Sequence, residues 1–172
     1  GVLFGREQQA KEFFDAQVAH IEPILEKEKT GLSVAFFAVA SDGTVTVRKP
    51  NDYVSSMIEL AGGTYSLNGY VEEEENALST LKMQMEDFYA AEKDADILIY
   101  NGTIEGELTS IAELVQKNSL FADFKAVKSG QVYTTGSNFY QQTSGTCDFI
   151  EDLNKVLTGD TDAEYRFLKK LD

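Results

Sequence analysis

The sequence predicts a three-layer α/β fold, in which helices cover both faces of a mostly parallel central sheet that carries one β-hairpin. Two continuous apolar runs, residues 33–40 and 97–100, are typical of strands buried on both faces. Helical apolar patterns lie between the strand-like runs, and the order of strand, helix and strand is that of a parallel sheet. The 172 residues predict a single α/β domain, residues 1–172, with a substantial core.

A helix is predicted at the N-terminus, within residues 1–29. Apolar residues recur there at spacings of four, three and four, which places them on one helix face: Phe14, Val18, Ile21 and Leu25. Pro23 interrupts this pattern and is expected to end or kink the helix.

The predicted hairpin turns at Asp42-Gly43. The two residues of such a turn need positive φ, and strand-like runs flank this pair, with β-branched alternation over residues 44–47. A helix from Tyr53 to Ala61 follows, and either Asn51 or Asp52 is suited to cap its first turn.

The rest of the chain alternates between strand and helix patterns. A short edge strand is expected over residues 65–67, and a strand at residues 131–133. Helices are expected along four stretches, which carry Leu78, Leu81, Met85 and Phe88; Ser110 and Glu113 as a capping box; Phe149, Ile150, Leu153, Val156 and Leu157; and, after Thr161, the residues Phe167, Leu168 and Leu171.

The charge and the apolar pattern exclude several classes of function. The formal net charge is −14, from 29 acidic and 15 basic residues, so the surface repels nucleic-acid phosphates and anionic lipid. No apolar run approaches the ~20 residues that cross a bilayer. We therefore expect no nucleic-acid partner and no membrane-spanning segment.

Residues suited to catalysis are scarce. The single histidine, His20, lies in the first predicted helix, away from the loops expected to form a site. The single cysteine, Cys147, precludes an intrachain disulfide and is expected to be a buried structural thiol at a helix start. The sequence has neither a phosphate-binding loop nor a complete dinucleotide fingerprint. We therefore expect no enzymatic activity, no cofactor and no metal site.

Loops rich in aromatic and amide side chains point instead to binding. They are expected to open on the same side of the sheet, beyond the carboxyl ends of the strands. Such side chains, with one or two cations, suit a bulky, partly anionic small molecule. The predicted ligand-binding residues are Arg48, Lys49, Tyr53, Tyr100, Asn101, Thr103, Asn138, Phe139 and Tyr140.

Four segments resemble one protein family. Residues 124–133 are similar to the "AVK-x-G-x-VY" segment of solute-binding proteins that serve bacterial ABC importers for iron-siderophores, haem and cobalamin. Residues 94–99 resemble that family's "DADVII" strand entry, and residues 57–63 its helix ending in "LAGG". The opening, residues 3–10, looks like the helix after the long interlobe helix. The segments occur in the family's order and cover roughly residues 1–157.

The resemblance implies that this chain is the C-terminal lobe of a two-lobed protein, with the N-terminal lobe absent from it. Such a protein would be an extracytoplasmic monomer, in the periplasm or lipid-anchored at the cell surface. It would hold an iron-siderophore, haem, cobalamin or similar ligand between its lobes and deliver it to a membrane permease. Glu86 is the nearest match to the glutamate that docks on the permease. Tyr53, Tyr100 and Tyr140 would either supply phenolate to ferric iron or stack on an organic ligand.

Two other classes of function remain open. A flavodoxin-like enzyme or nucleotide-binding domain shares the sheet, but it should show the phosphate loop that is missing here. A stand-alone interaction module would use its acidic face to bind a basic protein. Binding of a small ligand separates that module from a solute receptor.

Overall fold

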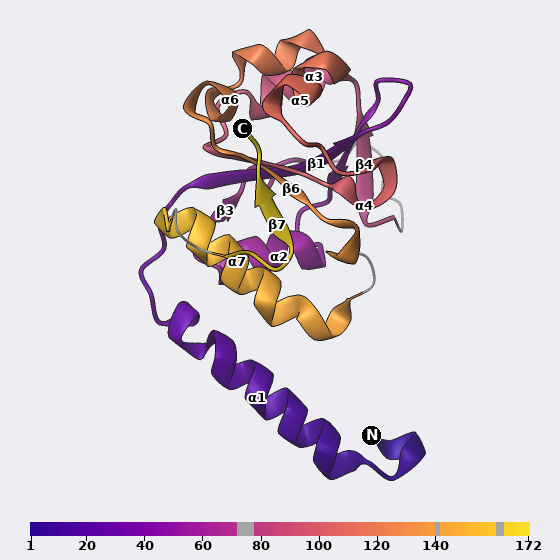
Figure 1. Ribbon diagram of the computed structural model, residues 1–172, viewed down its shortest axis with the longest axis vertical. Coiled ribbons are helices and arrows are strands. Elements are labelled where there is room, and N and C mark those ends of the chain that lie inside the picture. Colours follow the sequence, from indigo (N-terminus) through magenta and orange to yellow (C-terminus); the bar gives the residue numbers. More distant parts are fainter. Residues whose placement is uncertain (72–77, 140–141, 161–163) are drawn as a thin grey trace.

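The computed structural model describes residues 1–71, 78–139, 142–160 and 164–172, and for Ile104 the backbone alone. Over these ranges, the chain forms a three-layer α/β sandwich with one open sheet (Figure 1). The predicted class of fold is therefore confirmed. The strands are β1 (Ser33–Val39), β2 (Val45–Arg48), β3 (Thr64–Tyr65), β4 (Thr80–Met83), β5 (Ile97–Tyr100), β6 (Val132–Thr135) and β7 (Leu168–Lys170).

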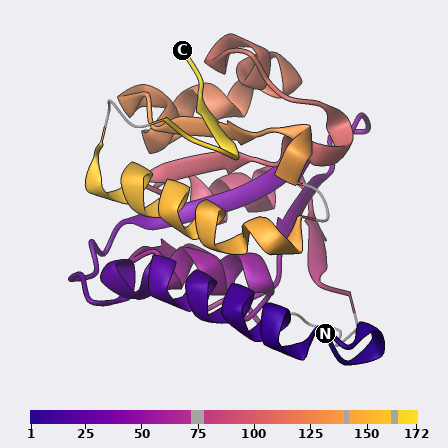
Figure 2. The same ribbon diagram turned by 60° about the horizontal axis from the view of Figure 1, so that its bottom comes forward.

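Helices occupy both faces of the sheet. The α-helices are α1 (Glu7–Leu25), α2 (Tyr53–Leu60), α3 (Met85–Glu92), α4 (Gly102–Glu105), α5 (Ile111–Lys117), α6 (Lys125–Ser129) and α7 (Thr146–Thr158). The 3-10 helices are η1 (Val2–Phe4), η2 (Ser119–Asp123), η3 (Ser137–Phe139) and η4 (Thr143–Gly145). Helices α3, α5 and α6 lie on one face, α2 and α7 lie on the other, and α1 lies outside α2 and α7 (Figures 1 and 2). None of the helices within the described ranges is long and apolar enough to cross a membrane.

The strand order is β4-β2-β1-β5-β6-β7, and β3 also pairs with β1. Strand β1 pairs in parallel with β3 and β5, and β5 pairs in parallel with β6. The other three pairings, β1 with β2, β2 with β4 and β6 with β7, are antiparallel. The sheet is thus mixed, and the expectation of a mostly parallel sheet is wrong, because two of its strands were predicted as parts of helices.

Most local signals in the first half of the chain act as predicted. The β1–β2 hairpin forms, and Gly43 has a φ of +85°. Asp42 has no positive φ, and the backbone hydrogen bond from the Ala40 N–H to the Thr44 carbonyl closes the turn over residues 41–43, so the expected two-residue turn with positive φ at both positions is wrong. The side chain of Asp52 caps α2 by accepting a hydrogen bond from the backbone N–H of Val54 at 3.1 Å. Pro23 lies within α1, which ends two residues later at Leu25.

Both missed strands lie at the ends of this strand order. The predicted helix beginning at Leu78 starts only at Met85, and Leu81 belongs to β4. The predicted final helix begins in residues outside the described ranges, and the part that is described forms β7. This strand is held by the buried carboxylate of Asp152, which accepts hydrogen bonds from three successive backbone N–H groups: those of Arg166, Phe167 and Leu168.

The core has one apolar layer on each face of the sheet, because successive strand residues point to opposite faces. On the α3 side, the ring of Phe37 lies 4.9 Å from that of Phe88 and 5.4 Å from that of Phe121, measured between centroids. On the α7 side, Phe36 contacts Phe139 at 6.0 Å. This second layer is the one that adjoins the candidate site.

Candidate functional site

A hollow of about 580 Å³ lies between α2 and the start of α7. Its size falls within the range of about 300–1,000 Å³ that is usual for small-molecule sites. The lining is mostly apolar and aromatic, with a few hydroxyl and amide groups. The lining residues are Tyr53, Ser56, Met57, Leu60, Phe139, Gln142, Thr143, Gly145, Thr146, Phe149 and Phe167.

Two elements form the walls of the hollow. Tyr53, Ser56, Met57 and Leu60 lie at helical spacing, which brings them to one side of α2. The opposite wall begins at Phe139, at the end of η3, whose ring lies 4.4 Å from that of Phe149 on α7. The hollow therefore depends on where η3, η4 and the start of α7 lie.

Two residues predicted from separate loops meet at this hollow. Tyr53 and Phe139 both line it, although they are 86 positions apart in the sequence. Arg48 adjoins it through Tyr53: its Nη2 donates a hydrogen bond to the tyrosine Oη at 3.2 Å, and its guanidinium carbon lies 5.0 Å from the ring centroid. The structure thus brings together two predicted residues from separate loops, Tyr53 and Phe139, and places Arg48 beside them.

Arg48 reaches this place by a route that differs from the prediction. Strand β2 runs antiparallel to β1, and Arg48 is the last residue of β2. Arg48 therefore lies beyond the Phe37–Val47 pair, at the end of β2 remote from the hairpin, where it pairs with Thr80 of β4. The expectation that its loop opens at the carboxyl ends of the strands is therefore wrong. Arg48 adjoins the hollow because its side chain lies on the sheet face that also carries Phe36: Phe37 pairs with Val47, so Arg48 is level with Phe36, and successive strand residues alternate between the faces.

A neighbouring shallow pocket, of about 120 Å³, includes Arg48, Thr80, Asn101 and Glu105 in its lining. Asn101 is the N-cap of α4, and its Oδ1 accepts hydrogen bonds from the backbone N–H of Thr103 at 3.2 Å and from its hydroxyl at 2.7 Å. Both predicted residues therefore take part in a local cap at the edge of this pocket.

Tyr100 does not face the candidate site. It pairs with Phe37 across β1 and β5, so both side chains point to the α3 side of the sheet, away from the hollow. Tyr100 has no exposed surface, and its hydroxyl lies buried with no hydrogen-bond partner among the described residues. In this structure, Tyr100 is a core residue, contrary to the expectation that it contacts ligand.

The other predicted ligand residues lie nearby or outside the described part of the chain. Asn138 is exposed, and its Nδ2 donates a hydrogen bond to the carbonyl oxygen of Arg166 at 2.9 Å. Lys49 is half-buried directly after β2, and its backbone N–H donates to the carbonyl oxygen of Ser79. Tyr140 lies outside the described residues.

Much of the lining was not predicted from the sequence. Met57, Leu60, Phe149 and Phe167 were assigned to helix faces without a ligand. A usable signal was present in α2, where Tyr53 and Leu60 expose 54% and 42% of their surfaces, which is high for large apolar side chains. The position of Phe167 had no local signal, because it depends on the β7 pairing.

His20 lies in a cluster of polar side chains between α1 and α7. Its Nε2 lies 2.9 Å from Oε2 of Glu151, and Asp148 lies close by. Each carboxylate also has a cationic partner, Lys155 for Glu151 at 3.0 Å and Arg166 for Asp148 at 2.6 Å. These contacts join α1 to α7, so we interpret the group as structural.

Two further predictions concern Cys147 and Glu86. Cys147 is buried in the first turn of α7, as expected, and burial raises the pKa of its thiol. Glu86 is exposed in the first turn of α3, on the face of the sheet opposite the hollow. It is therefore accessible to a partner.

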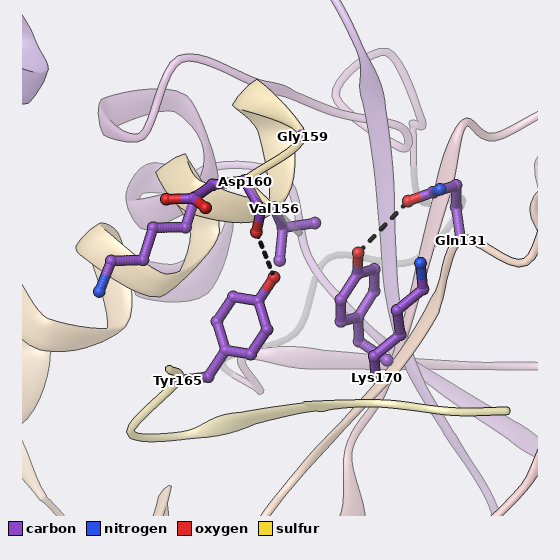
Figure 3. A pocket seen from close by; sticks show the side chains of 8 residues that line it. Gln131, Val156, Gly159, Asp160, Tyr165 and Lys170 are labelled. Carbon is purple, nitrogen blue, oxygen red and sulfur yellow. Dashed lines mark hydrogen bonds between the residues drawn. The ribbon is translucent and has the colours of Figure 1, made fainter. Parts of the chain in front are cut away.

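A smaller hollow of about 100 Å³ lies at the far end of α7 (Figure 3). Tyr165 Oη donates a hydrogen bond to the Asp160 carbonyl, and Tyr133 Oη donates to the Gln131 side chain, both at 3.3 Å. Desolvation raises the pKa of Tyr133 to about 12. This hollow is too small for a bulky ligand.

Residues 3–139 match the family model described as periplasmic binding protein. The match covers most of the chain, and the chain belongs to this family. Its members are solute-binding proteins, and the hollow is consistent with a role in binding substrate. No curated protein matches this sequence.

Several solved structures of bacterial proteins have a similar fold. A TroA-like periplasmic binding protein, FepB, from Veillonella parvula has a TM-score of 0.71 at 13% identity, over 98% of this chain and 58% of its own. An Fe3+-hydroxamate transport system from Saccharomonospora viridis has a TM-score of 0.73 at 17% identity, over 91% and 51%. A possible iron-binding protein from Staphylococcus epidermidis has a TM-score of 0.65 at 21% identity, over 94% and 58%. This chain spans little more than half of each.

Proposed function

We propose that residues 1–172 form the C-terminal lobe of the substrate-binding component of an ABC importer. The observation that carries the proposal is the aromatic hollow between α2 and α7, in a chain of the periplasmic binding protein family. A second lobe would close over this face, and the closed form would be selected by ligand contacts to both lobes. The protein would act outside the cytoplasm, in the periplasm or lipid-anchored at the cell surface.

The proposed ligand is a ferric siderophore, haem, cobalamin or a similarly bulky molecule. The names of the similar structures, an Fe3+-hydroxamate transport system and a siderophore-binding protein among them, support the ferric chelates. Tyr53 and Phe139 would contact the ligand directly, with Arg48 beside them. Lys49, Asn101, Thr103, Asn138 and Tyr140 stay predicted contacts, whereas buried Tyr100 is left out.

The proposed partner is a membrane permease, which Glu86 would contact from α3. Because Glu86 is exposed and lies across the sheet from the hollow, it could engage a permease while ligand is bound. We expect the protein to be a monomer without enzymatic activity. The Glu86→Gln variant should bind ligand normally and lose transport.

Thermal unfolding tests the proposed function. The protein expressed from the complete gene and the 172-residue chain would each be heated with haem, cobalamin, a neutral ferric trihydroxamate and a trianionic ferric tricatecholate. A ligand at 100 times its Kd stabilises the form that binds it by about 2.7 kcal/mol. We expect a clear rise in melting temperature for the complete gene product with one of these ligands, and a smaller rise for the chain alone.

The absence of a shift with every ligand would contradict the receptor assignment. It would favour an interaction module that binds protein through its acidic surface. A shift caused by a nucleotide or flavin would favour the flavodoxin-like alternative.

A further inference from the structure

The longest uncharged segment of the chain supplies part of the lining of the hollow. Residues 129–147 contain no Asp, Glu, Lys, Arg or His, although charged residues make up 26% of the chain. Its described parts, residues 129–139 and 142–147, hold the last residue of α6, then β6, η3 and η4, and the first residues of α7. It supplies Phe139, Gln142, Thr143, Gly145 and Thr146 to the lining. One wall of the hollow therefore carries no formal charge.

The remaining lining residues are uncharged as well. Tyr53, Ser56, Met57 and Leu60 come from α2, and two phenylalanines complete the set. The rings of Phe139, Phe149 and Phe167 lie 4.4–6.3 Å apart, measured between centroids, which forms a packed aromatic surface. Such a surface favours apolar or aromatic groups and offers an anion no compensating charge.

Two arginines that contact lining side chains, Arg48 and Arg166, already have carboxylate partners. Arg48 donates to Tyr53 Oη, and its Nη1 lies 3.8 Å from Oδ1 of Asp52. The Arg166 guanidinium lies 5.4 Å from the ring centroid of Phe167 and pairs with Asp148 at 2.6 Å. An anionic ligand would compete with these carboxylates for both cations.

Two further electrostatic features also disfavour an anion. The N-terminus of α7, whose partial positive charge would attract an anion, has Asp148 in its first turn. The net charge of −14 repels anions before they reach the hollow.

We propose that the hollow between α2 and α7 binds an uncharged apolar or aromatic part of the ligand and selects against anionic groups. The inference rests on the proposed function, because it takes this hollow to be the ligand site of the lobe. Negative charge on a ligand must then be met outside the hollow.

A pair of fluorescent probes tests the charge preference directly. N-phenyl-1-naphthylamine is neutral, and 8-anilinonaphthalene-1-sulfonate has the same rings with one added sulfonate. Both brighten in apolar surroundings, and the absence of tryptophan from the chain leaves a low fluorescence background. We expect the neutral probe to bind at least tenfold more tightly, a difference of about 1.4 kcal/mol.

Charge substitutions at Leu60 locate the probes. Leu60 lines the hollow and is 42% exposed, so a charged side chain is accommodated there without burial. Leu60→Lys should tighten sulfonate binding, and Leu60→Glu should weaken it further, each by threefold or more. Gln116 is exposed on α5, across the sheet, so Gln116→Lys and Gln116→Glu are the matched controls and should change neither affinity.

Equal affinities for the two probes in the wild type would overturn the proposal. So would equal responses to substitution at Leu60 and at Gln116, because the probes would then lie elsewhere. The ligand panel described above is independent of this result. Failure of every chelate to bind, with the neutral probe still preferred, would remove the receptor function and leave the charge selectivity of the hollow intact.

Discussion

Glu92 provides the strongest test of the energetics of this fold. It is the last residue of α3, it is 1% exposed, and neither carboxylate oxygen has a hydrogen-bond partner among the described residues. Desolvation therefore raises the pKa of Glu92 from 4.5 to about 7. The nearby Ser66 hydroxyl offsets part of this rise, although it donates its own hydrogen to the Val34 carbonyl at 2.9 Å.

The direction of the pH dependence follows from this rise. Between pH 4.5 and 7, the folded state retains a proton that the unfolded state releases, so raising the pH favours unfolding. A difference of about 2.5 pKa units at ~1.36 kcal/mol each amounts to about 3 kcal/mol. This stability is fully present below pH 4.5 and is lost progressively as the pH rises to about 7.

The assay is urea unfolding, followed by circular dichroism, of the wild type and Glu92→Gln between pH 5 and pH 8. The amide is neutral throughout, whereas the other carboxylates of the two proteins titrate alike. We expect the free energy of unfolding of the wild type to fall by about 2–3 kcal/mol relative to the variant over this range. Parallel profiles, with a gap constant to within about 0.5 kcal/mol, would refute the assignment of a protonated buried Glu92.

Two other buried groups give predictions of opposite sign. Tyr100→Phe removes a buried hydroxyl that has no partner among the described residues, so it should raise the free energy of unfolding by about 1 kcal/mol, measured from the urea midpoint. A decrease would mean that the hydroxyl is satisfied. Asp152→Ala leaves the backbone N–H groups that hold β7 without an acceptor, so it should lower that free energy by about 3 kcal/mol and speed hydrogen exchange in β7. Unchanged exchange there would contradict the role of Asp152.

Much of the fold was predictable because its signals are local. The apolar run of β1, the turn at Gly43 and the Asp52 cap each act within a few residues. The strand, the hairpin and the cap form as expected, although Asp42 does not take the predicted positive φ. The edge strands were missed for the opposite reason. Leu81 lies four residues before Met85, which suggested a helix, and β7 depends on pairing with β6 and on Asp152.

The candidate site was predictable in part. Tyr53 and Phe139 were identified from residue type, but their meeting depends on how α2 and α7 pack beneath the sheet. Tyr100 was misplaced because a continuous apolar strand gives no sign of which face each residue occupies, and its pairing with Phe37 directs it to the α3 side. The remaining lining, Phe167 above all, follows from a strand that the sequence did not predict.

The central claim is tested most directly by measuring equilibrium binding to the Tyr53→Ala variant. The ligand is the one that raises the melting temperature of the complete gene product. Tyr53 lines the hollow and is 54% exposed, so its removal should alter the site with little effect on folding. The control is Gln116→Ala, on the opposite face. If this lobe contributes the hollow to the binding site, Tyr53→Ala will raise Kd about tenfold, which weakens the free energy of binding by about 1.4 kcal/mol. The control variant will bind as the wild type does. Unchanged affinity in Tyr53→Ala would contradict the account and place the ligand elsewhere.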